Sequence, residues 1–284
     1  MRALWLADVL RGVGLTVVEQ PGWETRGKEL DAIEGVVSHH TASPPTSTLA
    51  ANLNVVMNGN GIAPGPIAQL LLDRDGTWYV IASGKANHAG AGGPWGWLPL
   101  SPPGQLSTAN ARTIGIEAIN SGVGEPWAAE MVISYEIGCA ALLKRIGVGV
   151  DRLLTHHEWA PSRKIDPAGP TAGRVATLPR SQTWDGNAWR ALVAEWMQPP
   201  EPPLPPIDIP PAFEEDSPML IVGREANHND PRRWLWDGIG VRLLLSEDEF
   251  NRARMLFRLH PSFNTLAAPF WMDDAELERF GGKP

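Results

Sequence analysis

The sequence has little cysteine, no excess of positive charge and no long apolar run, and each absence argues against a class of protein. Its one cysteine, Cys139, cannot form an intrachain disulfide, and its position in the apolar stretch 131–143 predicts a core residue. The formal net charge of −8 argues against a broadly basic surface for nucleic acid. No stretch approaches the roughly 18 apolar residues of a membrane-spanning helix, so we expect no membrane insertion.

The N-terminal segment 1–18 does not have the pattern of a signal peptide. Asp8 and Arg11 interrupt its apolar run, and no small-residue cleavage site follows. We therefore expect this segment to fold as a helix and a strand. We also expect the protein to be made in a cytoplasm without an export signal of its own.

A proline-rich segment divides the chain. Nine of the twenty residues 199–218 are Pro, five are acidic and none is basic. This composition favours extended polyproline II and cannot build a core. We predict a semi-stiff linker here, between a body of residues 1–198 and a small C-terminal module of residues 219–284.

The body alternates segments of strand and helix periodicity, which predicts an α/β fold with a central mixed β-sheet covered by helices. Asp75-Gly76 lies between two β-rich runs and predicts a hairpin. The segments 86–104 and 161–174 are rich in Gly, Pro and Asn, and we expect them to be long loops that form the walls of a site. The predicted strands are 15–19, 34–40, 67–73, 77–82 and 113–120, and the predicted helices are 4–11, 46–57, 128–146 and 187–197.

Four of the seven histidines form two adjacent pairs, His39-His40 and His156-His157, each at the end of an apolar run. Adjacent side chains on a strand point to opposite faces, so at most one member of each pair should face a common site. The other member should pack or form hydrogen bonds elsewhere. Paired histidines alone are weak evidence for a metal site.

The segment after the second pair, HHEWAPSRKIDP, places a lysine and a carboxylate two residues apart. Pro161 and Pro167 prevent a continuous helix, and in an extended loop Lys164 and Asp166 can face the same side. Such a pair can be a surface ion pair, which contributes little to stability. It can also be a zinc ligand beside a cation that stabilises an oxyanion.

Four motifs occur in the order of a known family: GVVSHHTAS at 35–43, NHAG at 87–90, IGIE at 114–117 and HHEWAPSRKIDP at 156–167. Together they resemble the type 2 N-acetylmuramoyl-L-alanine amidases, a family that includes phage lysins, anhydro-muropeptide amidases and peptidoglycan recognition proteins. The opening segment 5–27, with Pro-Gly-Trp at 21–23, resembles endolysins of phages that infect actinobacteria. The likeness extends over about residues 1–175.

The resemblance implies a single catalytic zinc ion bound by His39, His156 and Asp166. In each histidine pair the first member corresponds to the family ligand, which fits the expectation of one ligand per pair. Two histidines and one carboxylate leave a fourth position open, which is the pattern of catalytic rather than structural zinc.

The resemblance also implies the groups that move protons and stabilise charge. Glu117 corresponds to the general base that later protonates the leaving amine, and Lys164 to the lysine that stabilises the oxyanion. The alternative for Glu117 is a strand carboxylate that points to solvent. Some phage members have a catalytic tyrosine before the hairpin, but this chain has Ala68 there, and neither Tyr79 nor Tyr135 fits that position.

Peptidoglycan is the implied substrate and partner. We expect Asn87, His88 and Trp95 to contact it along the groove wall, although His88 can also be a loop histidine satisfied by its neighbours. The expected reaction is hydrolysis of the amide bond between N-acetylmuramic acid and L-alanine. The alternatives are a non-catalytic peptidoglycan-binding protein and a muropeptide-recycling amidase. Non-catalytic relatives typically lack the third zinc ligand, so the presence of Asp166 favours an enzyme.

The C-terminal module is short and holds eight of the 21 aromatic residues. Most should form its own core, because domains of this size are marginally stable. Trp234 or Trp236, on a predicted hairpin, can instead stack on sugar rings. Ser246 and Glu249 form a capping box that predicts a helix over 246–259, which makes the module α+β.

The resemblance to endolysins leads to two further expectations. The C-terminal module would bind the cell wall. The protein would be made in the host cytoplasm and would reach the wall after the membrane is permeabilised. The sequence does not determine the oligomeric state, and a monomer is favoured.

Overall fold

The computed structural model describes residues 1–101 and 108–198 and, further along, four strand segments at 220–224, 233–236, 241–244 and 270–272. The chain divides into two compact units, Met1–Pro200 and Glu201–Pro284, which are described separately. The predicted linker 199–218 and the predicted helix 246–259 lie outside the described residues.

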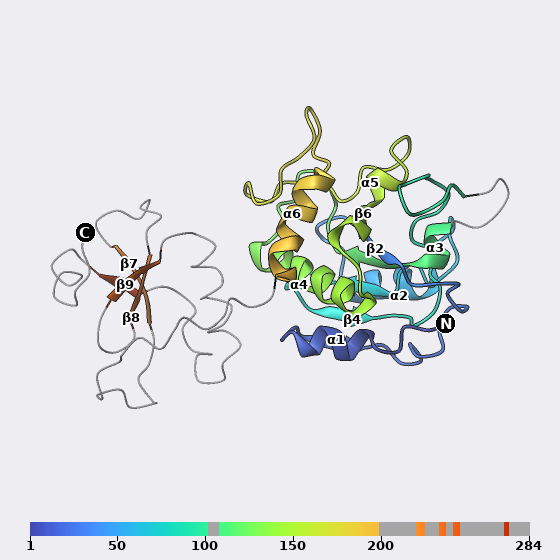
Figure 1. The fold of residues 1–284 in the computed structure, drawn as a ribbon, viewed down its shortest axis with the longest axis horizontal. Coiled ribbons are helices and arrows are strands. Elements are labelled where there is room, and N and C mark those ends of the chain that lie inside the picture. The colour runs from blue at the N-terminus through green and yellow to red at the C-terminus, as the bar shows by residue number, and fades with distance from the viewer. Residues whose placement is uncertain (102–107, 199–219, 225–232, 237–240, 245–269, 273–284) are drawn as a thin grey trace. The chain divides into compact units, whose positions relative to one another are not determined.

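The first unit is built on a six-stranded sheet in the order β1-β4-β3-β5-β2-β6 (Figure 1). Neighbouring strands are parallel except for β3 and β4, which are antiparallel, so the predicted mixed sheet is confirmed. The central strands β2 and β5 are buried along their whole length. The strands are β1 Val17–Glu19, β2 Gly35–His40, β3 Leu70–Leu72, β4 Trp78–Val80, β5 Thr113–Ala118 and β6 Leu153–Thr155.

The antiparallel pair β3–β4 is the hairpin predicted from Asp75-Gly76. The backbone N–H of Gly76 donates to the carbonyl of Asp73 at 3.0 Å, and the N–H of Thr77 donates to the Asp75 carboxylate at 2.9 Å. Gly76 has a φ of 83°, a conformation that glycine adopts without strain. Both strands are shorter than predicted because only three residues in each pair across the ladder.

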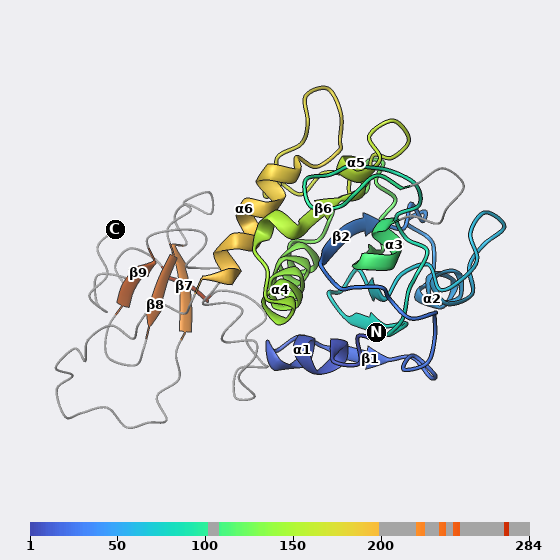
Figure 2. The ribbon, with the colours of Figure 1, turned by 45° about the vertical axis from the view of Figure 1, so that its right-hand side comes forward.

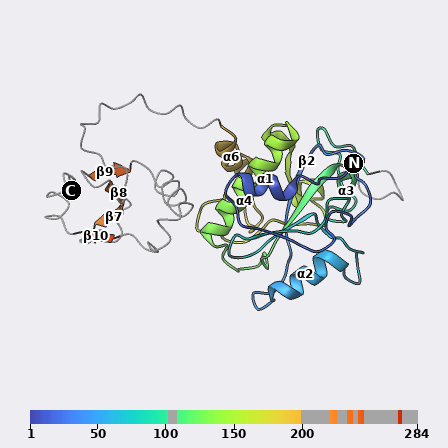
Figure 3. The same ribbon diagram turned by 90° about the horizontal axis from the view of Figure 1, so that it is seen from below.

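Helices cover both faces of the sheet. In Figure 3, α2 lies on one side of the sheet and α1 and α4 on the other, and α6 packs beside α4 (Figure 2). The helices are α1 Leu6–Gly12, α2 Leu49–Asn58, α3 Thr108–Arg112, α4 Ala129–Ile146, α5 His156–Trp159 and α6 Gly186–Met197, with a 3₁₀ turn at Val150–Arg152. None of the helices in the described part of the chain has the length and apolar character needed to cross a bilayer.

The four long helices end close to the residues predicted for them, and local capping explains their bounds. Thr48 caps α2 by accepting a hydrogen bond from the N–H of Ala51, and Asp185 caps α6 in the same way. Gly147, in the left-handed conformation, ends α4. The sequence did not predict β6, α3 or α5, each of which has only three to five residues.

Alternation along β2 separates the two faces. Val36 packs in the cluster formed with α1, α4 and α6, and the hydroxyl of Ser38 lies 3.9 Å from the sulfur of Cys139 on α4. Val37 and His39 therefore face the opposite side, where α2 lies. Cys139 is fully buried, as expected for a core residue.

The second unit contains a four-stranded sheet in the order β10-β7-β8-β9. Trp234 and Trp236 lie on β8, which pairs antiparallel with both β7 and β9. The strands are β7 Leu220–Arg224, β8 Arg233–Trp236, β9 Val241–Leu244 and β10 Phe270–Met272.

Candidate metal centre and active site

Three parallel strands bring the site residues to one edge of the sheet. His39 near the end of β2 is in register with Glu117 on β5, so both side chains lie on the α2 face. β6 pairs Thr155 with Ser38, and the chain then turns directly into α5 at His156. The carboxyl ends of neighbouring parallel strands are where open α/β sheets bind ligands.

His39, His156 and Asp166 form a compact, buried cluster. Nδ1 of His39 lies 2.8 Å from Nδ1 of His156 and 3.1 Å from Oδ2 of Asp166, and the His156–Asp166 distance is 2.9 Å. Ligand atoms around a tetrahedral zinc ion with bonds of about 2.0 Å lie about 3.3 Å apart. The three atoms would therefore need only small shifts to hold one ion.

The protonation states of the cluster also suit a metal. Burial and the neighbouring His156 together lower the pKa of His39 to about 3, and Asp166 only partly offsets them. Burial alone would raise the pKa of Asp166, but its contacts with His156 and His39 hold that pKa well below the usual range. A neutral imidazole and an ionised carboxylate are the forms that bind metal ions.

The second histidine of each pair fastens the loop that carries Lys164 and Asp166. Nδ1 of His40 accepts a hydrogen bond from the N–H of Ala168 at 3.0 Å. Nδ1 of His157 contacts the carbonyl of Lys164 at 2.6 Å, and its backbone N–H donates to the carbonyl of Asp166 at 2.9 Å. One member of each pair joins the cluster and the other does not, as strand alternation led us to expect.

The second pair reaches this arrangement in a different way, because His156 and His157 begin a helix instead of ending a strand. Thr155 caps α5 by accepting from the N–H of Glu158, while the Glu158 carboxylate accepts from the N–H of Thr155. The T-x-x-E spacing of this capping box is a signal in the sequence for a helix start, and it could have predicted α5. Arg190 on α6 then binds the same carboxylate with two hydrogen bonds, at 2.9 and 2.8 Å.

Glu117 occupies an unfavourable position for a charge. Its side chain is almost fully buried, and its Oε2 has no hydrogen-bond partner among the described residues. Burial raises its pKa well above the usual value; the negative charge of Asp166 adds to the rise, and Lys164 opposes it. A carboxyl group with a raised pKa is better suited to take up and release a proton than an ordinary surface carboxylate.

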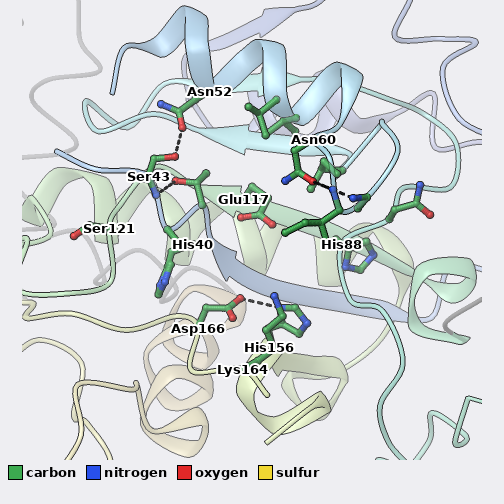
Figure 4. Close-up of a pocket in the computed structure, with 18 of the residues that line it drawn as sticks. His40, Ser43, Asn52, Asn60, His88, Glu117, Ser121, His156, Lys164 and Asp166 are labelled. Atoms are coloured by element: carbon green, nitrogen blue, oxygen red, sulfur yellow. Dashed lines mark hydrogen bonds and ion pairs between the residues drawn. The ribbon is translucent and has the colours of Figure 1, made fainter. Parts of the chain in front are cut away.

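A cavity of about 580 Å³ opens over this edge of the sheet. Figure 4 shows Glu117, Lys164, Asp166 and His156 facing it, with α2 on the opposite wall. Four exposed aliphatic side chains lie around it: Val55 on α2, Ile62, Val123 and Ile165. The cavity thus combines a polar, titratable floor with an apolar rim.

The residues predicted to contact substrate fall in different places. Asn87 and His88 line the cavity, and the Asn87 amide also donates to the carbonyl of Pro64. His88 is deeply buried, with Nδ1 3.0 Å from Nε2 of His39. Trp95 does not line this cavity; its ring packs with a cluster that includes Trp159, and Arg190 lies over it.

Several cavity residues were not singled out from the sequence. His40, Arg163 and the α2 residue Asn52 all line the cavity. The sequence predicted His40 only as a packing or hydrogen-bonding residue. Arg163 lies inside the HHEWAPSRKIDP motif, and this position next to Lys164 could have indicated that it lines the site. Asn52 had no signal, because only the packing of α2 against the sheet brings it to the site.

Comparison with known proteins identifies a family for most of the first unit. Residues 29–169 match the family model described as N-acetylmuramoyl-L-alanine amidase. None of the curated proteins searched matches the chain.

Several solved structures are similar to the chain. The amidase LysC from Clostridium intestinale is 17% identical with a TM-score of 0.41, and the match covers 63% of this chain and 97% of LysC. The hydrolase AmiA from Staphylococcus aureus is 17% identical with a TM-score of 0.44, covering 64% and 82% of the two chains. Drosophila PGRP-LB is 16% identical with a TM-score of 0.35, covering 52% and 86%.

The family match spans β2, β5, α5 and the loop to Asp166, which are the elements that build the buried cluster and Glu117. Residues 29–169 therefore form a domain of the N-acetylmuramoyl-L-alanine amidase family.

Proposed function

We propose that this protein hydrolyses the amide bond between the lactyl group of N-acetylmuramic acid and L-alanine in peptidoglycan, with one zinc ion held by His39, His156 and Asp166. The observation that carries the proposal is the convergence of three metal-binding atoms, within 3.1 Å of one another, beside a cavity that Glu117 and Lys164 also line. A zinc ion in such a site polarises a carbonyl and lowers the pKa of water to about 7.

Glu117 is the proposed proton carrier. Its raised pKa lets the carboxylate accept a proton from the attacking water as the new C–O bond forms. The same group then donates that proton to the leaving nitrogen of L-alanine as the C–N bond breaks. Because its Oε2 has no partner among the described residues, no hydrogen bond there has to break before it reacts.

Lys164 is the proposed stabiliser of the negative charge that develops on the carbonyl oxygen. Its side chain lines the same cavity as Glu117 and Asp166, and the loop carrying it is tied down by His157. A preorganised cation in a site with little water stabilises an oxyanion more strongly than one in bulk solvent. This arrangement favours an enzyme over a protein that only binds peptidoglycan.

We further propose that the protein is a phage endolysin that acts on the host cell wall once the membrane has been permeabilised. The likeness of segment 5–27 to endolysins of actinobacterial phages and the proline-rich segment before a second unit support this role. A second, tethered contact raises the effective concentration of an enzyme on an insoluble polymer, but it brings no gain with a small soluble substrate. We propose that the second unit provides this contact by binding the wall.

Hydrolysis of N-acetylmuramoyl-L-alanyl-D-isoglutamine, followed by mass spectrometry, tests the reaction. We expect N-acetylmuramic acid and the free dipeptide as products, loss of turnover with EDTA, and recovery after zinc is added back. A zinc-loaded, folded protein that leaves this compound and longer muropeptides intact would contradict the proposal.

A further inference from the structure

We infer that His88 is a positioning residue for the metal centre: its ring and the carbonyl of the next residue, Ala89, hold both cluster histidines with their Nδ1 lone pairs facing the metal position. The inference rests on the proposed zinc site and assigns to His88 a role other than substrate contact. It follows from where the protons of a buried hydrogen-bond chain must lie.

The first half of this hydrogen-bond network runs from the Thr113 hydroxyl through the ring of His88 to the ring of His39. The Thr113 hydroxyl donates its single hydrogen to the carbonyl of Ala109 at 2.8 Å, so toward Nε2 of His88, at 3.5 Å, it can only accept. His88 therefore carries its proton on Nε2 and has a lone pair on Nδ1. That lone pair accepts the Nε2–H of His39 at 3.0 Å, which leaves Nδ1 of His39 without a proton.

The reverse proton arrangement is less favourable. It would put a lone pair on Nε2 of His88 opposite the Thr113 hydroxyl, whose hydrogen is already donated to the carbonyl of Ala109. Nε2 would then be a buried acceptor without a donor. Buried polar atoms are rarely left unpaired, because the desolvation cost is not recovered.

The second half of the network fixes His156. Its Nε2 lies 2.9 Å from the carbonyl oxygen of Ala89, and a carbonyl can only accept, so the proton is on Nε2 and the lone pair on Nδ1. The backbone N–H of Ala89 donates to the Asn110 side chain at 2.7 Å, and Arg163 also donates to the Ala89 carbonyl. The dipeptide 88–89 is thus fastened from both sides.

The packing around His88 shows a position built for this ring. A Cβ atom on Gly115 would lie 2.3 Å from Cγ of His88. The His88 ring therefore occupies the space that a side chain at position 115 would need. Gly115 lies two residues before Glu117 on the same face of the strand. The ring is therefore held against the sheet directly behind His39.

The metal position is therefore surrounded by electron-rich atoms. Two nitrogen lone pairs and a carboxylate oxygen face one another within 3.1 Å, and a bound metal ion would relieve their repulsion. Groups that orient metal-binding histidines typically contribute about 10–100-fold to metal affinity.

Zinc affinity of the full chain, measured by competition with a chromophoric chelator and without substrate, tests the inference. We expect His88→Leu to weaken zinc binding about 10–100-fold. We expect His88→Asn, whose Oδ1 can replace Nδ1 as the acceptor for His39, to recover most of that loss. Ser134→Ala is the matched control: it removes a buried hydrogen bond to Trp78 and should leave zinc affinity unchanged.

A folded His88→Leu protein that binds zinc as tightly as the wild type would overturn the inference, and so would an Asn variant as weak as the Leu variant. If His88→Leu does not fold, Thr113→Val replaces it, because this change keeps the shape of the side chain and removes the hydroxyl that contacts His88 and the carbonyl of Ala109. It should weaken zinc binding in the same direction, and an unchanged affinity would again overturn the inference. Because no turnover is measured, an inactive wild type would contradict the proposed function and not this assignment.

Discussion

Glu117 combines a destabilising position with a proposed chemical role. A carboxylate buried on β5 without a hydrogen bond to Oε2 costs folding free energy in its charged form. Strain of this kind is typical of functional sites, where stability is lost in exchange for reactivity.

Replacing Glu117 by Gln should separate chemistry from metal binding. The variant keeps the shape of the side chain and loses the ability to carry a proton, so we expect turnover to fall about 10²–10⁴-fold. The zinc content should stay at one ion per chain, measured by elemental analysis. Near-normal turnover of muropeptides would remove Glu117 from the mechanism.

The same variant should change how stability depends on pH. Between the ordinary value of 4.5 and its raised folded-state pKa, Glu117 holds a proton in the folded protein that the unfolded chain has released. The contribution of Glu117 to the free energy of unfolding therefore falls as pH rises through this window. Zinc-free Glu117→Gln lacks this titration, so above pH 4.5 it should become more stable than the zinc-free wild type. The difference in the free energy of unfolding should grow by about 1.4 kcal/mol per pH unit across this window.

Urea unfolding of both zinc-free proteins at several pH values measures this difference. Glu29→Gln, on an exposed side chain, is the control and should follow the wild type. If the free energy of unfolding of Glu117→Gln and of the wild type changed in parallel at every pH, the pKa of Glu117 would not be raised in the folded protein.

Asp166 should be required for the metal. Asp166→Ala removes one of the three converging ligand atoms. Groups that only orient the ligands contribute about 10–100-fold to metal affinity, and we expect the loss of a ligand to weaken zinc binding by more than that. Asp151→Ala, on an exposed carboxylate, is the matched control. An Asp166→Ala protein with unchanged zinc content would exclude Asp166 as a ligand.

At the scale of elements, the metal-binding turn α5 depends on α6. Arg190 donates two hydrogen bonds to Glu158, and both side chains are mostly buried. Arg190→Met would leave the buried carboxylate without its ion-pair partner, which should lower the free energy of unfolding by about 3–5 kcal/mol.

The double variant Arg190→Met, Glu158→Gln removes the unpaired charge and should recover part of this loss in a denaturant titration. Zinc affinity should fall in the single variant as well, because Glu158 also caps the helix that begins at His156. Additive losses in the double variant would show that the two side chains do not act as a pair.

The same elements show how far the sequence could predict the fold. Long segments with regular periodicity, such as α4 and the hairpin at Asp75-Gly76, follow from local pattern alone. β6 and α5 were missed because three or four residues are too short to show a period, although Thr155 and Glu158 carry a capping signal. Their structure depends on pairing with β2 and on Arg190, which lies far along the chain.

The site residues could be predicted where a local motif marks them, but not where only tertiary contacts place them. His39, His156 and Asp166 were chosen as candidate ligands by motif order, and the structure brings them together. The position of His88 behind His39, and of Trp95 away from the cavity, depends on how residues 86–101 dock against α5. Tertiary contacts of this kind leave no period in the sequence.

At the scale of the whole molecule, the two units should be separable in function. The first unit has its own core on both faces of the sheet, so a fragment of residues 1–198 should fold by itself. It should hydrolyse a soluble muropeptide at the full-length rate. On intact cell walls it should act about 10²-fold more slowly or slower still, because the tethered second contact is lost. Equal rates on walls would contradict a wall-binding role for residues 219–284.

Digestion of purified actinobacterial cell wall, followed by analysis of the new chain ends, tests the central claim most directly. Cleavage between N-acetylmuramic acid and the stem peptide should release new L-alanine amino termini in step with the fall in turbidity, and no new reducing sugars. New reducing ends, or new amino termini on any other residue, would show that the protein cuts a different bond.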